Sequence, residues 1–380
     1  MKILLLAGEA SGVLYAERLK KSLADRLGDR APAFRGYDTE GFRTEDLAVM
    51  GFWPVLKRLG YFLGVARTMK RVIAQWHPDV VVTIDYPGLN LKLAAYAKSR
   101  GIPAVHVVCP QVWAWHQNRI PRVAASLNRL LCFFPFEPAL FGPPGTYGTF
   151  VAKFIGHPMV DVFAEEARPG RSADGTRLLA LLPGSRAGEI ARNLPRLLDA
   201  VRLLRGEGLR FRVTIPAASE RARQLIAAQL AGAPDVDAEL RAGGARDLLR
   251  RADCAAVASG TATLEAALAR CPTVLVYAVS RPLAWFARRV IRQIRHIGLA
   301  NVIWEKSLPD GGIGLEAPMP ELLQEAFTPE AVAAQLKSWL TDDAARTAAA
   351  VRLDEAMALL HSDGDALGLA AKEILEEAEA

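Results

Sequence analysis

The sequence is short of cysteine and has no long apolar segment. Its 380 residues include four cysteines, and no two of them form the C-x-x-C pair typical of zinc sites and redox centres. We therefore expect buried, reduced thiols at Cys109, Cys132, Cys254 and Cys271. No stretch reaches the roughly 18 uninterrupted apolar residues that would cross a bilayer. The chain is predicted to be soluble or to lie on a membrane from outside.

Signals for export, disorder and repeats are also missing. The first residues offer only about five apolar positions before Glu9, fewer than the roughly 7–15 of a signal-peptide core, so we expect a cytosolic protein. A hydrophobic content of 51% with 23% charged residues is typical of a packed globular chain, and no fixed-period repeat is visible. The formal net charge of +6 indicates an anionic partner but does not separate nucleic acid, lipid and phosphorylated metabolite.

Short apolar runs alternate along the chain with segments of helical length. This alternation is typical of βαβ units and predicts an α/β protein of two Rossmann-like, doubly wound domains facing a cleft. The expected strands are 3–7, 80–84, 104–108, 130–134, 178–182, 211–215, 254–258 and 273–277. Residues 164–176 indicate a linker. We predict a first domain over 1–165, a second over 177–355, and a helical tail over 356–380 that either extends the second domain or crosses back to the first.

Ligands of open parallel sheets bind beyond the carboxyl ends of the strands, and a first candidate loop follows the run 3–7. It contains Gly8, Glu9, Ser11 and Gly12. The glycines would let a substrate approach the backbone closely. A glycine turn also has an ordinary structural use, so both interpretations stay open.

Two further loops fall in the second domain. Gly184, Ser185 and Arg186, with Glu189 behind them, offer a tight turn, free amides and a guanidinium to a diphosphate. Ser259, Gly260 and Thr261 open a helix whose amino end favours phosphate, and Glu265 is spaced to accept hydrogen bonds from ribose hydroxyls. The alternative is that Ser259 and Thr261 only cap the helix. Together the two loops favour a nucleotide diphosphate.

Asp85 follows the buried run 80–84 directly, where burial would raise its pKa toward that of a general base. The alternative is that Asp85 caps the following helix. A loop at 110–115 is both aromatic and polar. Its Gln111 and Trp113 indicate a loop that stacks on a sugar or shapes an acceptor site.

Two segments, 47–73 and 281–295, combine large apolar and basic residues. The residues that mark them are Phe52, Trp53 and Phe62 in the first and Trp285, Arg288, Arg289 and Arg292 in the second. Basic amphipathic helices of this kind lie in the headgroup region of anionic membranes. An amphipathic helix packed on a core is commoner, so that alternative stays open. Nucleic acid would leave the apolar side chains without a partner, and we expect no nucleic-acid partner.

Eight motifs follow one another along nearly the whole chain. They are AGEASG (7–12), DLAVMGF (46–52), IDYPGLNL (84–91), PQVWAW (110–115), FPFE (134–137), FIGHPMVD (154–161), LLPGSR (181–186) and ASGTATLE (258–265). In this order they resemble the lipid-A-disaccharide synthase family, GT-B glycosyltransferases of bacterial outer-membrane lipid synthesis.

The resemblance implies an inverting, metal-independent transfer that needs no cofactor. 2,3-Diacylglucosamine would pass from UDP-2,3-diacylglucosamine to 2,3-diacylglucosamine 1-phosphate, giving a β-1,6 disaccharide and UDP. Asp85 would deprotonate the acceptor 6-hydroxyl, Arg186 would hold the diphosphate, and Glu265 the ribose. Asn301 and Gln324 match donor-site positions of the family. The amphipathic segments would dock the enzyme on the cytoplasmic leaflet of the inner membrane.

The chain departs from the family at three places in the first domain. Val13 and Gly88 stand where the family usually has aspartate, and residues 35–38 replace a glycine-rich segment. The alternatives are therefore a related GT-B enzyme with another acceptor, a UDP-sugar epimerase, and an inactive scaffold that binds UDP-sugar. The sequence predicts neither the acyl-chain length nor the oligomeric state.

Two D-x-D triplets, at 235–237 and 363–365, match the metal-binding motif of another glycosyltransferase architecture. Neither follows a strand at a sheet edge of the expected nucleotide domain, and a match of three residues arises easily by chance. We therefore assign no metal.

Overall fold

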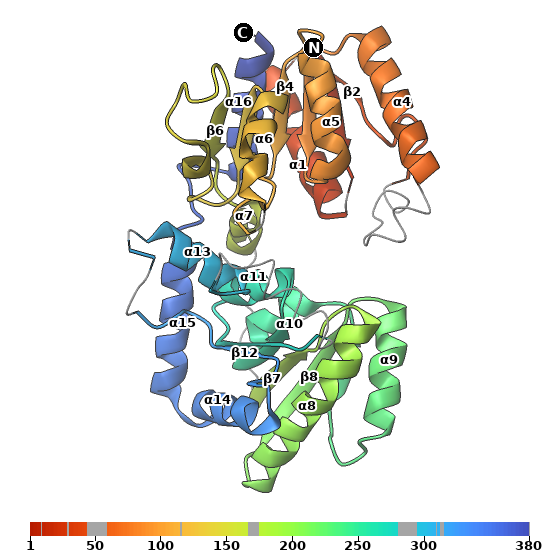
Figure 1. Ribbon diagram of the computed structural model, residues 1–380. Coiled ribbons are helices and arrows are strands. Elements are labelled where there is room, and N and C mark those ends of the chain that lie inside the picture. Colours follow the sequence, from red (N-terminus) through yellow and green to blue (C-terminus); the bar gives the residue numbers. More distant parts are fainter. Residues whose placement is uncertain are drawn as a thin grey trace. The chain divides into compact units, whose positions relative to one another are not determined.

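The computed structural model divides the chain into two compact units (Figure 1). The first comprises Met1–Asp161 and Leu360–Ala380, and the second comprises Val162–Leu359. The residues that the structure describes are 1–8, 10–28, 30–43, 59–114, 116–165, 175–279, 295–308, 310–311 and 315–379. Seven residues singled out from the sequence lie outside them: Glu9, Phe52, Trp53, Trp285, Arg288, Arg289 and Arg292.

The first unit is built on a six-stranded parallel sheet in the order β2-β1-β3-β4-β5-β6. Its strands are β1 (Lys2–Ala7), β2 (Ala33–Arg35), β3 (Val80–Ile84), β4 (Ala104–Val107), β5 (Arg129–Cys132) and β6 (Val151–Phe154). Its helices are α1 (Ala10–Leu27), α4 (Leu59–Trp76), α5 (Pro87–Lys98), η1 (Gln117–Arg119), α6 (Ile120–Ser126), η2 (Pro138–Phe141) and α16 (Ala366–Glu379). Strands β3 and β4 are buried throughout, as parallel strands between two helical layers are.

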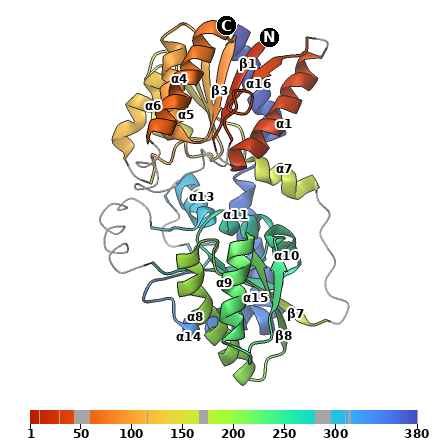
Figure 2. The ribbon, with the colours of Figure 1, turned by 90° about the vertical axis from the view of Figure 1, so that its right-hand side faces the viewer.

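Helices cover both faces of this sheet because successive strand residues point to opposite sides. Along β1, Ile3 and Leu5 pack in the cluster beneath α1 and α16, whereas Leu4 and Leu6 pack in the cluster beneath α4 and α5. Figure 2 shows α4 and α5 on the opposite side of the sheet from α1. The apolar run of β1 therefore serves two cores at once.

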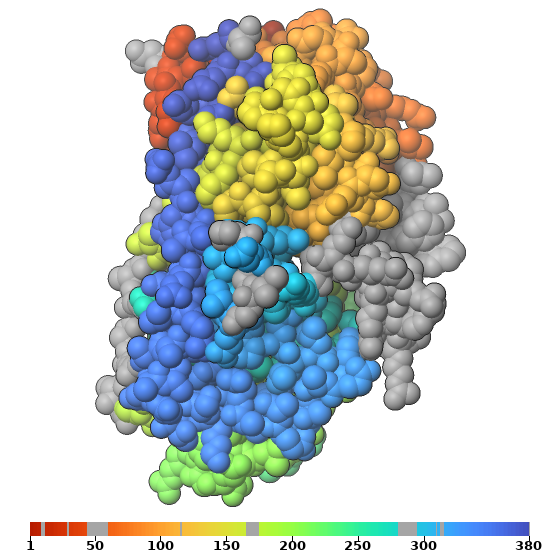
Figure 3. All heavy atoms as spheres, turned by 60° about the vertical axis from the view of Figure 1, so that its left-hand side comes forward, coloured from red at the N-terminus to blue at the C-terminus, as the bar shows by residue number. Residues whose placement is uncertain are grey.

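The C-terminal helix α16 belongs to the first unit, although it follows the whole second unit in the sequence. It lies beside α1, as Figure 2 shows and as the adjoining red and dark blue residues of Figure 3 show on the surface. Its Ala370, Ala371 and Ile374 share one buried cluster with Leu19 and Leu23 of α1. The end of the chain thus completes one face of the first core.

Ion pairs fix the other side of α16 to the sheet. Arg129, at the start of β5, pairs with Glu373, with Glu376 at 3.3 Å and with Glu377 at 3.1 Å. Lys153 of β6 also pairs with Glu373. The Glu373 side chain is only 3% exposed, so it depends on these two cations to offset the cost of its burial.

The second unit has the same architecture, with strand order β12-β11-β10-β7-β8-β9. Its strands are β7 (Arg177–Leu182), β8 (Phe211–Ala217), β9 (Glu239–Ala242), β10 (Cys254–Ala258), β11 (Thr273–Tyr277) and β12 (Glu321–Leu323). Its helices are α8 (Ala187–Gly206), α9 (Glu220–Ala231), α10 (Ala245–Arg251), α11 (Thr261–Leu268), α13 (Leu299–Ser307), α14 (Pro329–Thr341) and α15 (Asp343–Ala358), and α7 (Pro158–Glu165) spans the boundary between the units. Buried side chains of α8 and α14 pack on one face, and those of α10 and α11 on the other.

The prediction of two Rossmann-like α/β units is confirmed, and all eight predicted strands are present. The four strands that the sequence did not reveal are β2, β6, β9 and β12. They are the outermost strands of the two sheets, and their residues are exposed or half-buried, so none carries a continuous apolar run. The unit boundaries fall after Asp161 and Leu359, compared with the expected linker at 164–176 and the expected tail from 356.

Among the described residues, no helix is both long and apolar enough to cross a membrane. All four cysteines are buried and free, as their apolar surroundings in the sequence predicted.

We predict that Arg129→Ala lowers the free energy of unfolding by about 1–3 kcal/mol, because it leaves the buried Glu373 with Lys153 alone. The measurement is the thermal unfolding midpoint, together with the rate at which a protease releases the C-terminal helix. Arg223→Ala is the control, since it removes an ion pair with Glu220 on α9 that is exposed to solvent and screened by it. Equal midpoints for the two variants would show that the ion pairs do not hold α16.

Candidate active site

In each sheet the strand order reverses beside the first strand of the unit. The chain runs from β1 outward to β2 and returns to β3 on the other side of β1. In the second unit it runs from β7 outward to β8 and β9, and returns to β10 on the other side of β7. Ligands of open parallel sheets bind at such switch points, beyond the carboxyl ends of the strands. The loops after β1, β3, β7 and β10 are therefore the candidate site.

Asp85 is the first residue after β3, at the switch point of the first unit. Asp85 and Tyr86 both have left-handed backbone conformations, with φ of 50° and 51°. Burial raises the pKa of the half-buried Asp85 carboxyl above its usual 3.8, while a hydrogen bond of 2.8 Å from the Tyr86 amide to Oδ1 opposes the rise. No side chain caps α5, whose N-cap is Tyr86, so the alternative interpretation of Asp85 as a helix cap is wrong.

The glycine loop after β1 lies against the neighbour of Asp85. A Cβ on Gly8 would come within 2.7 Å of Tyr86 Cδ1, far inside van der Waals contact. Gly12 lies with Ser11 in the first turn of α1, where an added Cβ would make only ordinary contacts. Gly8 therefore has a structural reason to be glycine, and its use by a substrate stays a prediction.

The loop after β4 is supported from beneath by Trp113. This side chain is only 3% exposed, its Nε1 donates a hydrogen bond of 3.2 Å to Glu137 Oε1, and its ring packs edge-on against Phe134 and Phe136. The enclosed ring presents no face to a sugar, so the stacking interpretation is wrong for Trp113. Gln111 of the same loop is exposed, and its role in shaping an acceptor site stays a prediction.

Two of the cysteines meet Glu137 in a buried cluster that the sequence did not reveal. The ligating atoms of Cys109, Cys132 and Glu137 lie within 4.8 Å of one another. Hydrogen bonding to Cys132 and burial raise the pKa of the Cys109 thiol, and burial raises the pKa of Glu137 to about 8. Glu137 accepts hydrogen bonds from Trp113 Nε1 at 3.2 Å and from the Phe134 amide at 3.1 Å. Through these two hydrogen bonds the cluster supports the loop after β4.

In the second unit the loops after β7 and β10 enclose a cavity of about 450 Å³. Its lining includes these residues singled out from the sequence: Gly184, Ser185, Arg186, Ser259, Gly260, Thr261 and Glu265. The end of β8, the loops after β8 and β9 and the start of α10 complete it with residues that the sequence analysis missed, namely Pro216, Ala217, Ala218, Gly243, Gly244 and Ala245. Their only sequence signal is a run of small residues, which also marks ordinary turns.

Glu189 occupies the backbone amides that we expected the loop after β7 to offer to a diphosphate. Its Oε2 accepts hydrogen bonds from the amides of Ser185 and Arg186, at 3.2 and 3.3 Å, and its Oε1 accepts one from the Arg186 guanidinium at 3.0 Å. The prediction of free amides here is wrong, because an internal carboxylate already satisfies them at the start of α8. The Arg186 side chain is 65% exposed, so its guanidinium still faces solvent.

The amino end of α11 carries no side-chain cap, so the capping interpretation of Ser259 and Thr261 is wrong. The N-cap is Gly260, whose φ of 150° favours glycine. Glu265 lies one turn into the helix, half-buried in the cavity wall. Burial raises the pKa of its carboxyl, and the charge of Arg246 opposes the rise. The cavity lining thus combines the amino end of α11, the carboxyl of Glu265 and the guanidinium of Arg186.

Asn301 and Gln324 lie outside the set of residues that line this cavity. Asn301 is fully buried, and its amide bonds to the backbone of Met319 in both directions and to Glu321. The Gln324 amide, in the orientation that satisfies its neighbours, pairs with the backbone N–H and C=O of Val279. Both side chains are engaged within the unit, where they hold the loops after β11 and before β12.

One aspartate of each D-x-D triplet already has a partner. Asp235 forms a two-pronged ion pair with Arg202, at 2.6 and 2.8 Å. Asp365 caps the start of α16 through the Gly368 amide. Neither triplet lies among the residues that line the cavity of the second unit.

Of the residues expected at a membrane, Phe62 lies within the described part of the chain. It is half-buried on α4 and contacts the ring of Tyr61 at 5.6 Å. The next residue, Leu63, is 47% exposed, and Arg67 and Lys70 follow at helical spacing as exposed cations. This stretch of α4 thus presents an apolar and basic surface to solvent.

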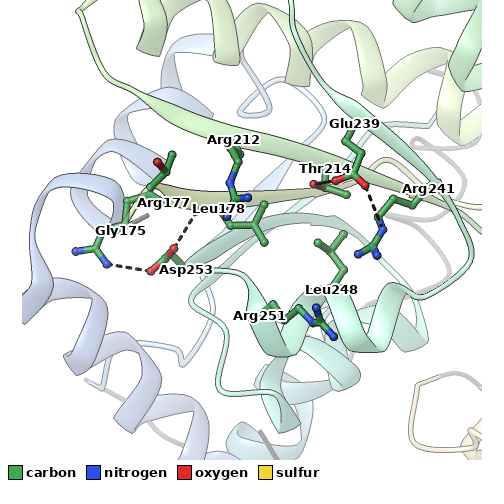
Figure 4. A pocket seen from close by; sticks show the side chains of 11 residues that line it. Gly175, Arg177, Leu178, Arg212, Thr214, Glu239, Arg241, Leu248, Arg251 and Asp253 are labelled. Carbon is green, nitrogen blue, oxygen red and sulfur yellow. Dashed lines mark hydrogen bonds and ion pairs between the residues drawn. The ribbon is translucent and has the colours of Figure 1, made fainter. Parts of the chain in front are cut away.

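A second cavity, of about 500 Å³, lies at the opposite edge of the second sheet (Figure 4). Of its arginines, Arg177 pairs with Asp253 at 3.0 Å and Arg241 with Glu239 at 3.4 Å. Because it opens at the amino ends of β7 and β8, it lies away from the switch-point loops. Its size does not make it the active site, because ligands of open parallel sheets bind beyond the carboxyl ends of the strands.

A family model described as lipid-A-disaccharide synthetase matches residues 3–367 of this chain. The chain belongs to this family. The lipid-A-disaccharide synthase of Anaeromyxobacter dehalogenans (strain 2CP-C) is 36% identical over 97% of this chain and 96% of its own length. That of Azoarcus sp. (strain BH72) is 36% identical over 95% of this chain and 91% of its own length. The chain is accordingly a UDP-sugar glycosyltransferase of lipid A disaccharide synthesis.

Solved structures place this member of the lipid-A-disaccharide synthase family in the GT-B fold. The S. aureus MnaA–UDP co-structure superposes with a TM-score of 0.61 at 14% identity, covering 98% of this chain and 94% of that one. The UDP-GlcNAc 2-epimerase from Neisseria meningitidis bound to UDP-GlcNAc gives 0.55 at 13% identity, covering 99% of both chains. Identities this low show the fold alone.

Proposed function

We propose that this chain transfers 2,3-diacylglucosamine from UDP-2,3-diacylglucosamine to 2,3-diacylglucosamine 1-phosphate. The new bond joins the acceptor 6-oxygen to donor C1, the bond from C1 to UDP breaks, and UDP leaves with the electron pair. The observation that carries the proposal is the cavity at the switch point of the second unit, in a chain that matches this family from residue 3 to 367. The products are a β-1,6 disaccharide 1-phosphate and UDP.

In this proposal the second unit binds the donor through UDP. The amino end of α11 and the exposed guanidinium of Arg186 supply positive charge for the diphosphate. Glu265 accepts hydrogen bonds from the ribose hydroxyls, a role supported by its half-buried position in the cavity wall. The same charges stabilise UDP as it leaves, so binding and catalysis use one set of groups.

In the first unit Asp85 is the proposed general base. Its carboxylate takes the proton of the acceptor 6-hydroxyl while that oxygen attacks C1 from the face opposite UDP, which inverts the configuration. Two observations support this role: Asp85 stands at the switch point, and burial raises the pKa of its carboxyl, which makes it a stronger base. The exposed Gln111 and the loop that begins at Gly8 would shape the acceptor site beside it.

The enzyme is further proposed to sit on the cytoplasmic leaflet of the inner membrane, where it meets acylated substrates. The described support is the surface of α4 formed by Leu63, Arg67 and Lys70. Exposed leucine beside cations is the composition that inserts among anionic headgroups.

We predict that Asp85→Ala abolishes transfer and leaves the dissociation constant for UDP nearly unchanged, because the base and the UDP cavity belong to different units. The assay mixes enzyme with both detergent-dispersed substrates and detects tetra-acylated disaccharide 1-phosphate and UDP by mass spectrometry. In the unaltered enzyme kcat/KM should fall as the pH drops through the pKa of Asp85, which burial places above 3.8.

Turnover retained by Asp85→Ala would reject the base assignment. Release of UDP and free sugar without disaccharide by the unaltered enzyme would reject the acceptor and favour an epimerase.

We predict that Glu265→Gln weakens UDP binding about tenfold, because a hydrogen bond to a charged group is worth about 1.5–3 kcal/mol and about 1.4 kcal/mol is tenfold. Calorimetry measures the affinity for UDP and for 2′,3′-dideoxy-UDP, which lacks the hydroxyls and should bind both proteins alike. Asp247→Asn is the control, since this exposed carboxylate pairs with Arg251 outside the cavity lining. An equal loss for both nucleotides would contradict contact with the ribose.

We predict that Leu63→Glu reduces binding to anionic phospholipid vesicles on the order of tenfold, because it removes an inserted apolar side chain and adds a negative charge. Sedimentation with vesicles gives the bound fraction. The control is Leu203→Glu, the same change at a residue of α8 that is 40% exposed. Identical binding of the two variants would place the membrane contact elsewhere than α4.

A further inference from the structure

Asn90 lies in the first turn of α5 and is fully buried. Its side-chain nitrogen lies within hydrogen-bonding distance of three backbone carbonyls: Asp85 O at 2.8 Å, Leu6 O at 3.2 Å and Ile84 O at 3.2 Å. Leu6 and Ile84 lie at the ends of β1 and β3, which flank the switch point, and Asp85 directly follows β3. The Asn90 amide thus links the end of β1 to the end of β3 and to Asp85.

The orientation of this amide is set from its other side. The Tyr37 hydroxyl donates a hydrogen bond of 2.6 Å to Asn90 Oδ1, so the NH2 group must face the carbonyls. Tyr37 is 2% exposed, and burial raises the pKa of its phenol far above the usual value of 10, so it remains a donor across the working pH range. The segment after β2 therefore contributes to the geometry at the end of β3.

The backbone at Asp85 requires such support. A left-handed conformation is uncommon for any residue but glycine and costs on the order of 1 kcal/mol for each residue that adopts it. Asp85 and Tyr86 adopt it in succession, so the turn persists only if its surroundings fix it. The bond from Asn90 to Asp85 O is the shortest of the three amide contacts, and the Asn90 backbone N–H also bonds to Tyr86 O at 3.2 Å.

We propose that Asn90, oriented by Tyr37, is the positioning residue of the proposed base: it fixes the left-handed turn that aims the Asp85 carboxylate at the acceptor hydroxyl. The inference rests on the proposed function of Asp85. Without the amide, the carbonyls of Asp85, Leu6 and Ile84 lose a shared donor. The turn then relaxes, and the Asp85 carboxylate moves away from the acceptor hydroxyl and toward solvent.

The test compares Asn90→Ala with Asn193→Ala. Asn193 is an equally buried asparagine of the second unit, where it bonds to Pro183 O at 2.9 Å and to the Ala278 amide at 3.3 Å. We expect Asn90→Ala to lower kcat by about 100-fold, the effect of a misplacement of about 1 Å, with the UDP dissociation constant unchanged. The acid limb of kcat/KM should move to lower pH, because the carboxyl becomes more solvated and its raised pKa falls.

A merely structural asparagine would lower the unfolding midpoint without moving the acid limb of the folded enzyme. Asn193→Ala should leave the acid limb of kcat/KM at the same pH. Any kinetic effect of this variant should appear in UDP binding. If Asn90→Ala does not fold, Tyr37→Phe decides, since it removes one neutral hydrogen bond and should lower kcat about 3- to 10-fold, with the acid limb displaced in the same direction.

Unchanged kcat and acid limb in the folded variant would overturn the inference. This result differs from failure of the proposed function, in which Asp85→Ala itself retains turnover. An inactive Asp85→Ala beside a fully active Asn90→Ala rejects the positioning role alone.

Discussion

The central strands of both sheets are parallel and covered by helices on both faces, so a polar side chain along them needs a partner there, as Thr83 and His106 are for each other. Burying an unpaired polar group costs several kcal/mol, so chemistry is confined to the points where a strand ends. Of these, the switch points are special because the helices that follow the two neighbouring strands leave in opposite directions. Asp85 and the cavity around Gly260 lie at these two points. Each is positioned by the buried apolar strand that precedes it in the sequence.

The two sites use opposite kinds of side chain to form hydrogen bonds with the backbone of their loops. After β7, the Glu189 carboxylate accepts from backbone amides, and after β3, the Asn90 amide donates to backbone carbonyls. Each side chain sits within the first turn of the helix that follows its strand, near enough to the loop to fix it. A loop fixed in this way needs little rearrangement when a ligand arrives, and that lowers the cost of binding.

The sequence predicts the central strands because continuous burial demands continuous apolar residues, and it predicts Asp85 because a carboxylate after such a run is unusual. The edge strands lack that demand, so β2 and β12 carry no signal. The role of Glu189 depends on a carboxylate turning back onto its own loop, and the cluster of Cys109 and Glu137 depends on contacts between separate segments. Trp113 shows the same limit, since a tryptophan in a sequence is compatible both with an exposed ring that stacks on a sugar and with a buried ring that supports a loop.

Two carboxyl groups follow strands of the first sheet, Asp85 after β3 and Glu137 after β5, and their surroundings assign them different tasks. Burial raises the pKa of both. Glu137 is 1% exposed, burial raises its pKa to about 8, and its oxygens are engaged by Trp113 and the Phe134 amide. Asp85 is half-buried and bonds to one amide, which leaves a face of its carboxylate for a substrate. Accessibility, more than pKa, therefore separates the proposed base from the structural acid.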